Sequence, residues 1–151
     1  MAIGVTIETT IGRPPAVVYA QVADIDAWPS WLIASGIVRV DRTSDGPLSE
    51  GERLKVEQRA AGRAGTFKAT VSALEPSSRL ALNGRDEDGV TIDIDAELAP
   101  EGDATNLRWS IRIGLPLRYR MFESMARPQV ERAAALDIEA LKRRLESTPA
   151  D

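Results

Sequence analysis

The chain has 151 residues, of which 43% are hydrophobic and 28% are charged, and it contains neither cysteine nor histidine. The lack of both residue types excludes disulfides, thiolate nucleophiles, imidazole bases and Cys/His metal sites. A net charge of -4 argues against a protein that binds nucleic acid through a basic surface.

The length is typical of one domain, so we expect a single domain over residues 1–151. Apolar and polar residues alternate over 3–11, which is the pattern of a half-buried strand. Pro15 follows that strand and favours the start of a helix that reaches Ala23, because proline is tolerated in a first helical turn. A second short helical piece is expected over 25–32.

Six further strands are expected after these helices, separated by short turns that are rich in glycine, proline and aspartate. Turns this short join antiparallel neighbours, since parallel strands need a crossover of a dozen or more residues. One of the turns is expected at 61–65. The expected strand ranges are 36–43, 52–60, 65–75, 78–86, 89–99 and 104–114.

The last two of these strands each have one apolar and one polar face. If the turn between them centres near Gly102, Glu97 lies opposite Arg108 and Asp93 lies opposite Arg112. Such exposed cross-strand pairs contribute only about 0.2–1 kcal/mol each, but they favour this register. One face of the sheet is therefore expected to meet water, and the other needs a cover.

The segment 117–146 supplies that cover, because its apolar residues recur at helical spacing. Pro128 is expected to kink or split the helix near 126–127. The predicted fold class is α+β, in which a curved antiparallel sheet wraps around a long C-terminal helix. The apolar positions of the helix are Leu117, Met121, Met125, Val130, Ala134, Ile138, Leu141 and Leu145.

This order of elements, with Asp24 and then Trp28-Pro29-Ser30-Trp31 after the first helix, resembles the SRPBCC (START/Bet v 1-like) superfamily. It is more closely similar to the bacterial polyketide cyclase/dehydrase and lipid-transport-like group, and the residues 45–51 and 136–142 agree with it. The resemblance covers essentially the whole chain. It implies a helix-grip fold with a cavity between the sheet and the long helix. These motifs mark the fold and not an activity, because only some members of the group are enzymes.

Apolar inward side chains with a few polar groups are the usual lining of a small-molecule site. Gln58 is a polar exception on the inward strand faces, and it is either a strand-end amide near solvent or a hydrogen-bond partner of a ligand. The tryptophans and methionines are expected first in the core, and Trp109 is best placed to line a cavity as well. The candidate set is Tyr19, Trp28, Trp31, Val56, Gln58, Phe67, Trp109, Tyr119, Met121, Phe122, Met125 and Asp137.

Charged residues give weaker signals. Asp137 is expected in an ion pair or a backbone contact, and the alternative is an acid or base with a raised pKa. Arg118 and Arg120 are expected at the surface, with a ligand carboxylate as the alternative. The acidic run 86–88 lacks the spacing of a calcium loop and is expected to be solvated. We expect no metal and no cofactor, and no catalytic motif is present.

The leading functional prediction is binding or transport of a hydrophobic small molecule, such as a lipid, a polyketide or an aromatic metabolite. The first alternative is a polyketide cyclase or dehydratase, in which Asp137, a tyrosine or water does the acid–base work. The second is a protein-interaction module, and the chain is expected to be a monomer or a homodimer. An empty pocket of about 300 Å³ would cost about 7 kcal/mol, so either a ligand or collapsed side chains must fill it.

No stretch approaches the roughly 20 apolar residues that cross a bilayer. The first residues also lack the basic and apolar regions of a signal peptide. We therefore expect no integral membrane segment and a cytoplasmic location.

Overall fold

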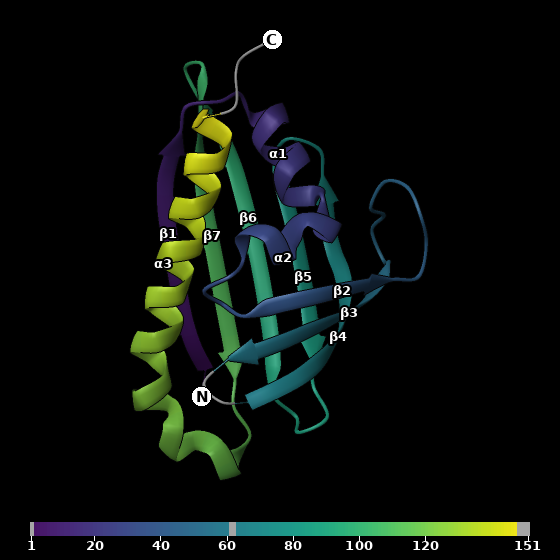
Figure 1. Cartoon of the computed structure of the whole chain (residues 1–151), viewed down its shortest axis with the longest axis vertical. Helices are drawn as coiled ribbons and strands as arrows, with labels where there is room; N and C mark the ends of the chain where they lie inside the picture. Colours follow the sequence, from purple (N-terminus) through teal and green to yellow (C-terminus); the bar gives the residue numbers. More distant parts are fainter. Residues whose placement is uncertain (1, 61–62, 148–151) are drawn as a thin grey trace.

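The computed structural model describes residues 2–60 and 63–147 (Figure 1). Seven antiparallel strands form one sheet in the order β1-β7-β6-β5-β4-β3-β2, and the helices lie on one side of it. Strands β2 to β6 each pair with the next strand in the chain, and β7 also pairs with β1. The strands are β1 (Ala2–Ile11), β2 (Ile37–Arg42), β3 (Arg53–Ala60), β4 (Arg63–Glu75), β5 (Arg79–Arg85), β6 (Thr91–Glu101) and β7 (Ala104–Gly114).

The α+β fold predicted from the sequence is confirmed, with one strand, two helical pieces, six strands and a long C-terminal helix. Of the turn expected at 61–65, residues 61 and 62 lie outside the described residues, and β4 already begins at Arg63. The helices are α1 (Pro15–Ala23), η1 (Ile25–Ala27), α2 (Trp28–Trp31), η2 (Leu117–Phe122) and α3 (Glu123–Ser147), where η marks a 3-10 helix.

The register of β6 and β7 is the one that charge pairing predicts. Glu97 lies opposite Arg108, and Asp93 lies opposite Arg112. The turn between the strands is centred on Gly102, whose φ of 61° lies in the left-handed region that glycine reaches without strain. The outer face of the sheet is therefore the charged one, and the inner face carries the apolar residues.

The long helix is buried in its second half only. Its buried residues are Ala134, Asp137, Ile138, Leu141 and Leu145. Leu117, Met121 and Met125 are instead 77%, 78% and 65% exposed, so the apolar stripe predicted to continue through them is wrong before Val130. The reason is local geometry. A 3-10 helix has about three residues per turn, so positions four apart in η2 do not share a face as they do in an α-helix.

The split that was one of the two expected effects of Pro128 near 126–127 does not occur. The change of helix type falls between Phe122 and Glu123, and α3 continues through Pro128. Pro128 lies within the first two turns of α3, where the loss of its N–H removes a single hydrogen bond near the helix start.

Three tryptophans form the centre of the core. The rings of Trp28, Trp31 and Trp109 meet edge to face with centroid distances of 6.3, 6.0 and 5.6 Å. Trp28 donates its indole N–H to the carbonyl of Val22 at 2.9 Å, whereas the indole N–H groups of the other two are buried without a partner. Burial of a tryptophan contributes about 4–6 kcal/mol, and an unpaired buried donor costs about 1–3 kcal/mol. The packing therefore outweighs the two missing hydrogen bonds.

We predict that Trp109→Ala lowers the free energy of unfolding by about 3–5 kcal/mol, because the cavity it leaves is surrounded by two other rigid rings. Urea denaturation followed by circular dichroism measures the change. Leu136→Ala, at a side chain that is 52% exposed on α3, is the matched control and is expected to change stability by less than about 0.5 kcal/mol. Equal effects of the two variants would contradict the central role of the tryptophan cluster.

Candidate functional site

An apolar hollow lies on the inner face of the sheet, beside Trp28 of α2. Its volume is about 20 Å³, which holds about one water molecule, whereas small-molecule pockets measure roughly 300–1,000 Å³. The sequence left open whether a ligand or collapsed side chains fill the pocket, and in the structure side chains fill it. The side chains that line the hollow include Trp28, Ile37, Val56, Gln58, Phe67, Ala69, Ile92 and Ile94.

The two ends of the inner face are covered to different extents. At the end below α1, Ala96, Leu107 and Trp109 are almost fully buried. At the other end, Ile92 and Ile113 are only partly buried, although they lie on the same strands and face the same way. In Figure 1, α3 runs along β1 at one edge of the sheet, while α1 and α2 lie over the strands further in. The first half of α3 therefore leaves apolar sheet surface thinly covered.

The loop between α2 and β2 fixes one wall of this region. The carboxylate of Asp137 on α3 accepts the backbone N–H groups of Ala34 and Ser35 at 2.8 and 2.9 Å. Gln58 on β3 donates its side-chain N–H to the carbonyl of Ser35 at 2.7 Å. Gly36 completes the loop with a φ of 77°, and a Cβ there would collide with the backbone carbonyl of Arg59. One loop thus joins the long helix to the sheet.

Burial changes the acidity of Asp137. Its side chain is 2% exposed, and desolvation raises the pKa of the carboxyl group above its usual value. The hydrogen bonds from Ser35 and Ala34 favour the charged form and oppose that rise. Among the roles considered for Asp137 from the sequence, the one seen in the structure is contact with the backbone, at Ala34 and Ser35.

Residues 2–146 match the family model described as polyketide cyclase / dehydrase and lipid transport. The chain belongs to this family. The family is part of the SRPBCC superfamily, so the resemblance noted in the sequence is confirmed. A search of curated proteins found no match to the chain.

Three solved structures illustrate the shared fold. TTHA0849 from Thermus thermophilus is 14% identical with a TM-score of 0.78, and the match covers 97% of this chain and 99% of that one. The ZhuI aromatase/cyclase from Streptomyces sp. R1128 is 15% identical with a TM-score of 0.77, covering 97% and 94%. Ara h 8.0201 is 15% identical with a TM-score of 0.70, covering 98% and 100%. At these identities the likeness establishes the fold.

The structure brings only part of the predicted candidate set together. Trp28, Val56, Gln58 and Phe67 line the hollow. The inward residues Ile37, Ala69, Ile92 and Ile94 also line it and were not in the candidate set, although the alternation of β6 had already placed the two β6 isoleucines on the inner face.

The remaining aromatic candidates lie elsewhere. Trp31 and Trp109 are buried in the core and do not line the hollow. Tyr19 lines a separate surface depression beside Leu48, and burial raises the pKa of its hydroxyl group. Tyr119 is partly buried on η2, with the guanidinium of Arg118 4.9 Å from its ring centroid.

Met121, Phe122 and Met125 do not line the hollow either. All three are exposed, so their expected packing in the core is wrong. Met121 and Phe122 end the 3-10 helix η2, and Met125 lies in the first turn of α3, before the part of the helix that is buried.

One residue of the acidic run 86–88 departs from the expected solvation, whereas Glu87 is exposed as expected. Asp86 is buried and not solvated, because its carboxylate accepts the N–H groups of Asp88 and Val90 and pairs with Arg63 at 2.8 Å. It therefore closes the β5–β6 loop. Within residues 2–60 and 63–147, no group of three or more acidic side chains is arranged to hold a metal ion. No helix in those ranges is long and apolar enough to cross a bilayer.

The raised pKa of Asp137 predicts a specific pH dependence. The folded protein binds this proton more tightly than the unfolded chain does, so the stability gained from protonation is present at low pH. It is lost as the pH rises from about 4 through the folded pKa. We expect the unfolding free energy of the wild type, minus that of Asp137→Asn, to fall over this window and to stay level above it. Urea titrations across the pH range measure the difference.

Subtracting the unfolding free energy of Asp137→Asn from that of the wild type cancels the pH dependence that comes from other titratable groups. Salt bridging and hydrogen bonding lower the pKa values of Glu52 and Glu146, so both destabilise the fold as the pH falls, in the wild type and in the variant alike. A difference that rises with pH would contradict a raised pKa at Asp137.

Proposed function

We propose that this protein binds a hydrophobic small molecule on the inner face of the sheet, between the hollow and the first half of α3. The observation that carries the proposal is the incomplete cover of that face. Ile92, Ile94 and Ile113 point inward but are only partly buried, and no residue of α3 before Ala134 is buried. An apolar surface of this kind in a concave region is the usual setting of a ligand site.

The chemistry of the lining supports an apolar ligand. The polar side chains around the hollow are those of Gln58 and the exposed Asn83, and the N–H group of Gln58 is already bonded to Ser35. On the inner face, the carboxamide oxygen of Gln58 remains to accept a hydrogen bond from a ligand. Such a lining favours a molecule that is mostly hydrocarbon or aromatic, with at most one polar group at this position.

The same lining favours binding over catalysis. The residues around the hollow include no acidic or basic side chain. Asp137, the candidate acid or base from the sequence, accepts two backbone N–H groups and holds a loop in place. A cyclase or dehydratase needs a group that transfers a proton to or from the substrate, and both oxygens of this carboxylate are engaged.

Entry of a ligand requires movement, because the hollow as it stands holds about one water. The first half of α3 and η2 are the elements least tied to the core, and segments with few buried contacts open at the lowest free-energy cost. We infer that they move away from β6 and β7 when the ligand enters. The cytoplasmic location expected from the sequence stays a prediction.

We predict that fatty acids or polycyclic aromatic compounds raise the melting temperature of the wild-type protein. A ligand at about one hundred times its Kd adds about 2.7 kcal/mol, which is about 5–10 °C for a chain of this size. Ile92→Trp fills the space next to the hollow and is expected to abolish the shift. Differential scanning fluorimetry with a panel of such compounds measures both effects.

Ile33→Trp is the matched control, because that side chain lies on the α2–β2 loop and is 70% exposed. It is expected to keep the full ligand-induced shift. The proposal is refuted if no compound stabilises the wild type, or if Ile92→Trp responds as the wild type does.

A further inference from the structure

The end of the molecule formed by η2 and the start of α3 exposes an unusual amount of apolar surface. Leu117, Met121 and Met125 are each at least 65% exposed, and Phe122 is 48% exposed. Residues 117–127 are called the η2 tip below. No residue of η2 is fully buried; Tyr119 is partly buried against the core, and Leu117, Met121 and Phe122 of the same 3-10 helix face outward. Large apolar side chains gathered at one exposed site mark a contact surface for another molecule or a membrane.

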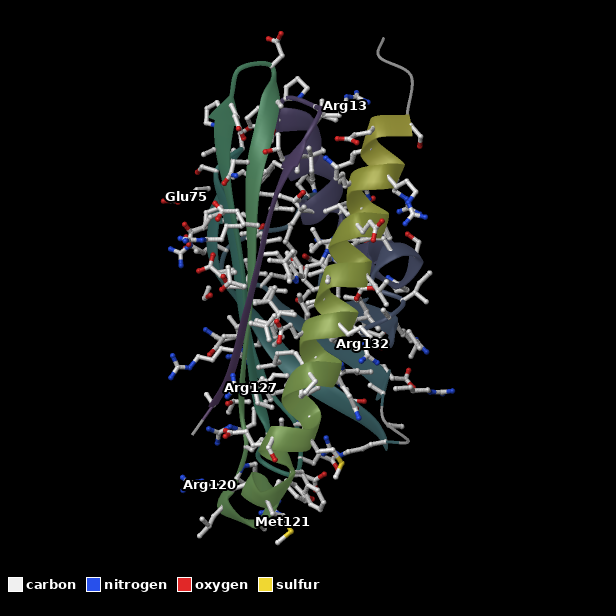
Figure 2. The ribbon with its side chains drawn as sticks, turned by 90° about the vertical axis from the view of Figure 1, so that its left-hand side faces the viewer. Arg13, Glu75, Arg120, Met121, Arg127 and Arg132 are labelled. Atoms are coloured by element: carbon white, nitrogen blue, oxygen red, sulfur yellow. The ribbon has the colours of Figure 1, made fainter. Side chains whose placement is uncertain are left out.

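The same eleven residues carry three positive charges. Arg118, Arg120 and Arg127 are exposed, and within residues 2–60 and 63–147 none of them forms an ion pair. Arg118 donates to the backbone carbonyl of Asp88, and Arg127 to that of Ala2 at 3.4 Å, so the charges are not neutralised by these bonds. Figure 2 shows Arg120 and Met121 at the very end of the molecule, pointing away from its body.

Within residues 117–127 the arginines outnumber the acidic groups. Glu123 is the one carboxylate within residues 117–127, and one of its oxygens is buried. In the neighbouring β5–β6 loop, Asp86 and Asp88 both pair with Arg63. Arg63 offsets only one of these two carboxylates and Glu87 adds another negative charge, so the β5–β6 loop is acidic, while the η2 tip itself, with three arginines and Glu123, carries a net charge of +2 in a chain whose net charge is -4.

This combination of charge and apolar surface selects among possible partners. A second copy of the chain placed on the tip through a two-fold axis would bring the arginines of both copies together, and like charges at an interface are unfavourable. An anionic lipid surface is complementary to both the positive charge and the apolar side chains of the tip. Arginines attract its headgroups, while methionine, leucine and phenylalanine side chains enter the boundary between headgroups and acyl chains.

We propose that the η2 tip docks on the surface of an anionic lipid bilayer. The proposal extends the binding function proposed above, because the hollow and the η2 tip lie at the same end of the fold. Pro116, which precedes η2, lies against Gly89 in the loop that leads into β6, and Ile92 of β6 lines the hollow. A bilayer would therefore be both the docking surface and the source or destination of the apolar ligand.

Vesicle co-sedimentation tests this proposal, with vesicles of phosphatidylcholine alone and of phosphatidylcholine mixed with phosphatidylglycerol. We expect the wild-type protein to bind the mixed vesicles, and to bind them more weakly as salt is added. Arg120→Gln with Arg127→Gln is expected to lower the partition coefficient about 25-fold, from about fivefold for each arginine. Met121→Ser with Phe122→Ser is expected to lower it by at least about tenfold, because both apolar groups leave the interface.

The controls change residues of the same kinds elsewhere on the surface. Ile33→Ser removes an exposed apolar side chain from the α2–β2 loop, and Arg143→Gln removes an exposed charge from the far half of α3. Both are expected to bind vesicles as the wild type does. Docking by the tip is refuted if the wild type stays in solution with both vesicle types, or if the tip variants bind as well as the controls.

Two further measurements separate this proposal from its alternatives. If size-exclusion chromatography gives a dimer that Met121→Ser with Phe122→Ser converts to a monomer, the tip is a self-association surface and the lipid assignment is wrong. The arginine variant is expected to keep the melting-temperature rise caused by hydrophobic compounds. A wild type that sediments with vesicles but shows no such rise would refute the proposed ligand binding and leave the docking surface standing.

Discussion

A buried carboxylate fixes where the long helix meets the rest of the molecule. Asp137 lies almost entirely out of solvent, and an unpaired charge there would cost several kcal/mol. It is tolerated because it accepts the N–H groups of Ala34 and Ser35, which sit 103 and 102 residues earlier in the chain. This contact, together with the buried apolar residues that follow it on α3, ties the second half of the helix to the fold. The first half has no equivalent anchor.

The tryptophan cluster divides the inner face into a sealed part and a thinly covered part. Trp28, Trp31 and Trp109 fill the space beneath α1 and α2, where an empty pocket of about 300 Å³ would cost about 7 kcal/mol. That penalty is comparable with the whole stability of a domain, so dense packing there is the expected outcome. Trp28 also forms the inner wall of the hollow. The remaining apolar surface therefore lies at the end that α3 covers least.

The sequence was sufficient to predict the sheet and the order of its elements, because alternation and turn composition are local signals. It also predicted a pairing between β6 and β7 from the charges of Glu97 and Arg108, which the register confirms. The exposure of Met121 was not predictable from spacing. Leu117, Met121 and Met125 are four residues apart, as on one face of an α-helix, but residues 117–122 form a 3-10 helix, in which positions four apart do not share a face. The burial of Asp86 depends on Arg63 in another strand, which no local pattern reveals.

The candidate site was harder to predict for a related reason. Periodicity states which face a side chain lies on, but not how deeply the opposite layer covers it. Ile92 and Ala96 have the same alternation on β6, yet one is partly exposed at the hollow and the other is fully buried. The difference comes from α1 and Trp109, which lie against Ala96, whereas α3 follows β1 at the edge of the sheet and leaves the Ile92 end of β6 thinly covered (Figure 1).

The uneven anchoring of α3 links ligand entry to the exposed tip in energetic terms. Lifting the first half of the helix in water uncovers isoleucines of β6 and β7, and full exposure of each such side chain costs about 1.5–3 kcal/mol. The cost falls when the uncovered surface meets lipid instead of water, because the transfer of apolar area to water is then avoided. The segment that must move is also the one that carries the η2 tip, and Pro128 leaves one hydrogen bond fewer near its start. A bilayer held against that tip would therefore lower the barrier to opening at the place where the fold resists it least.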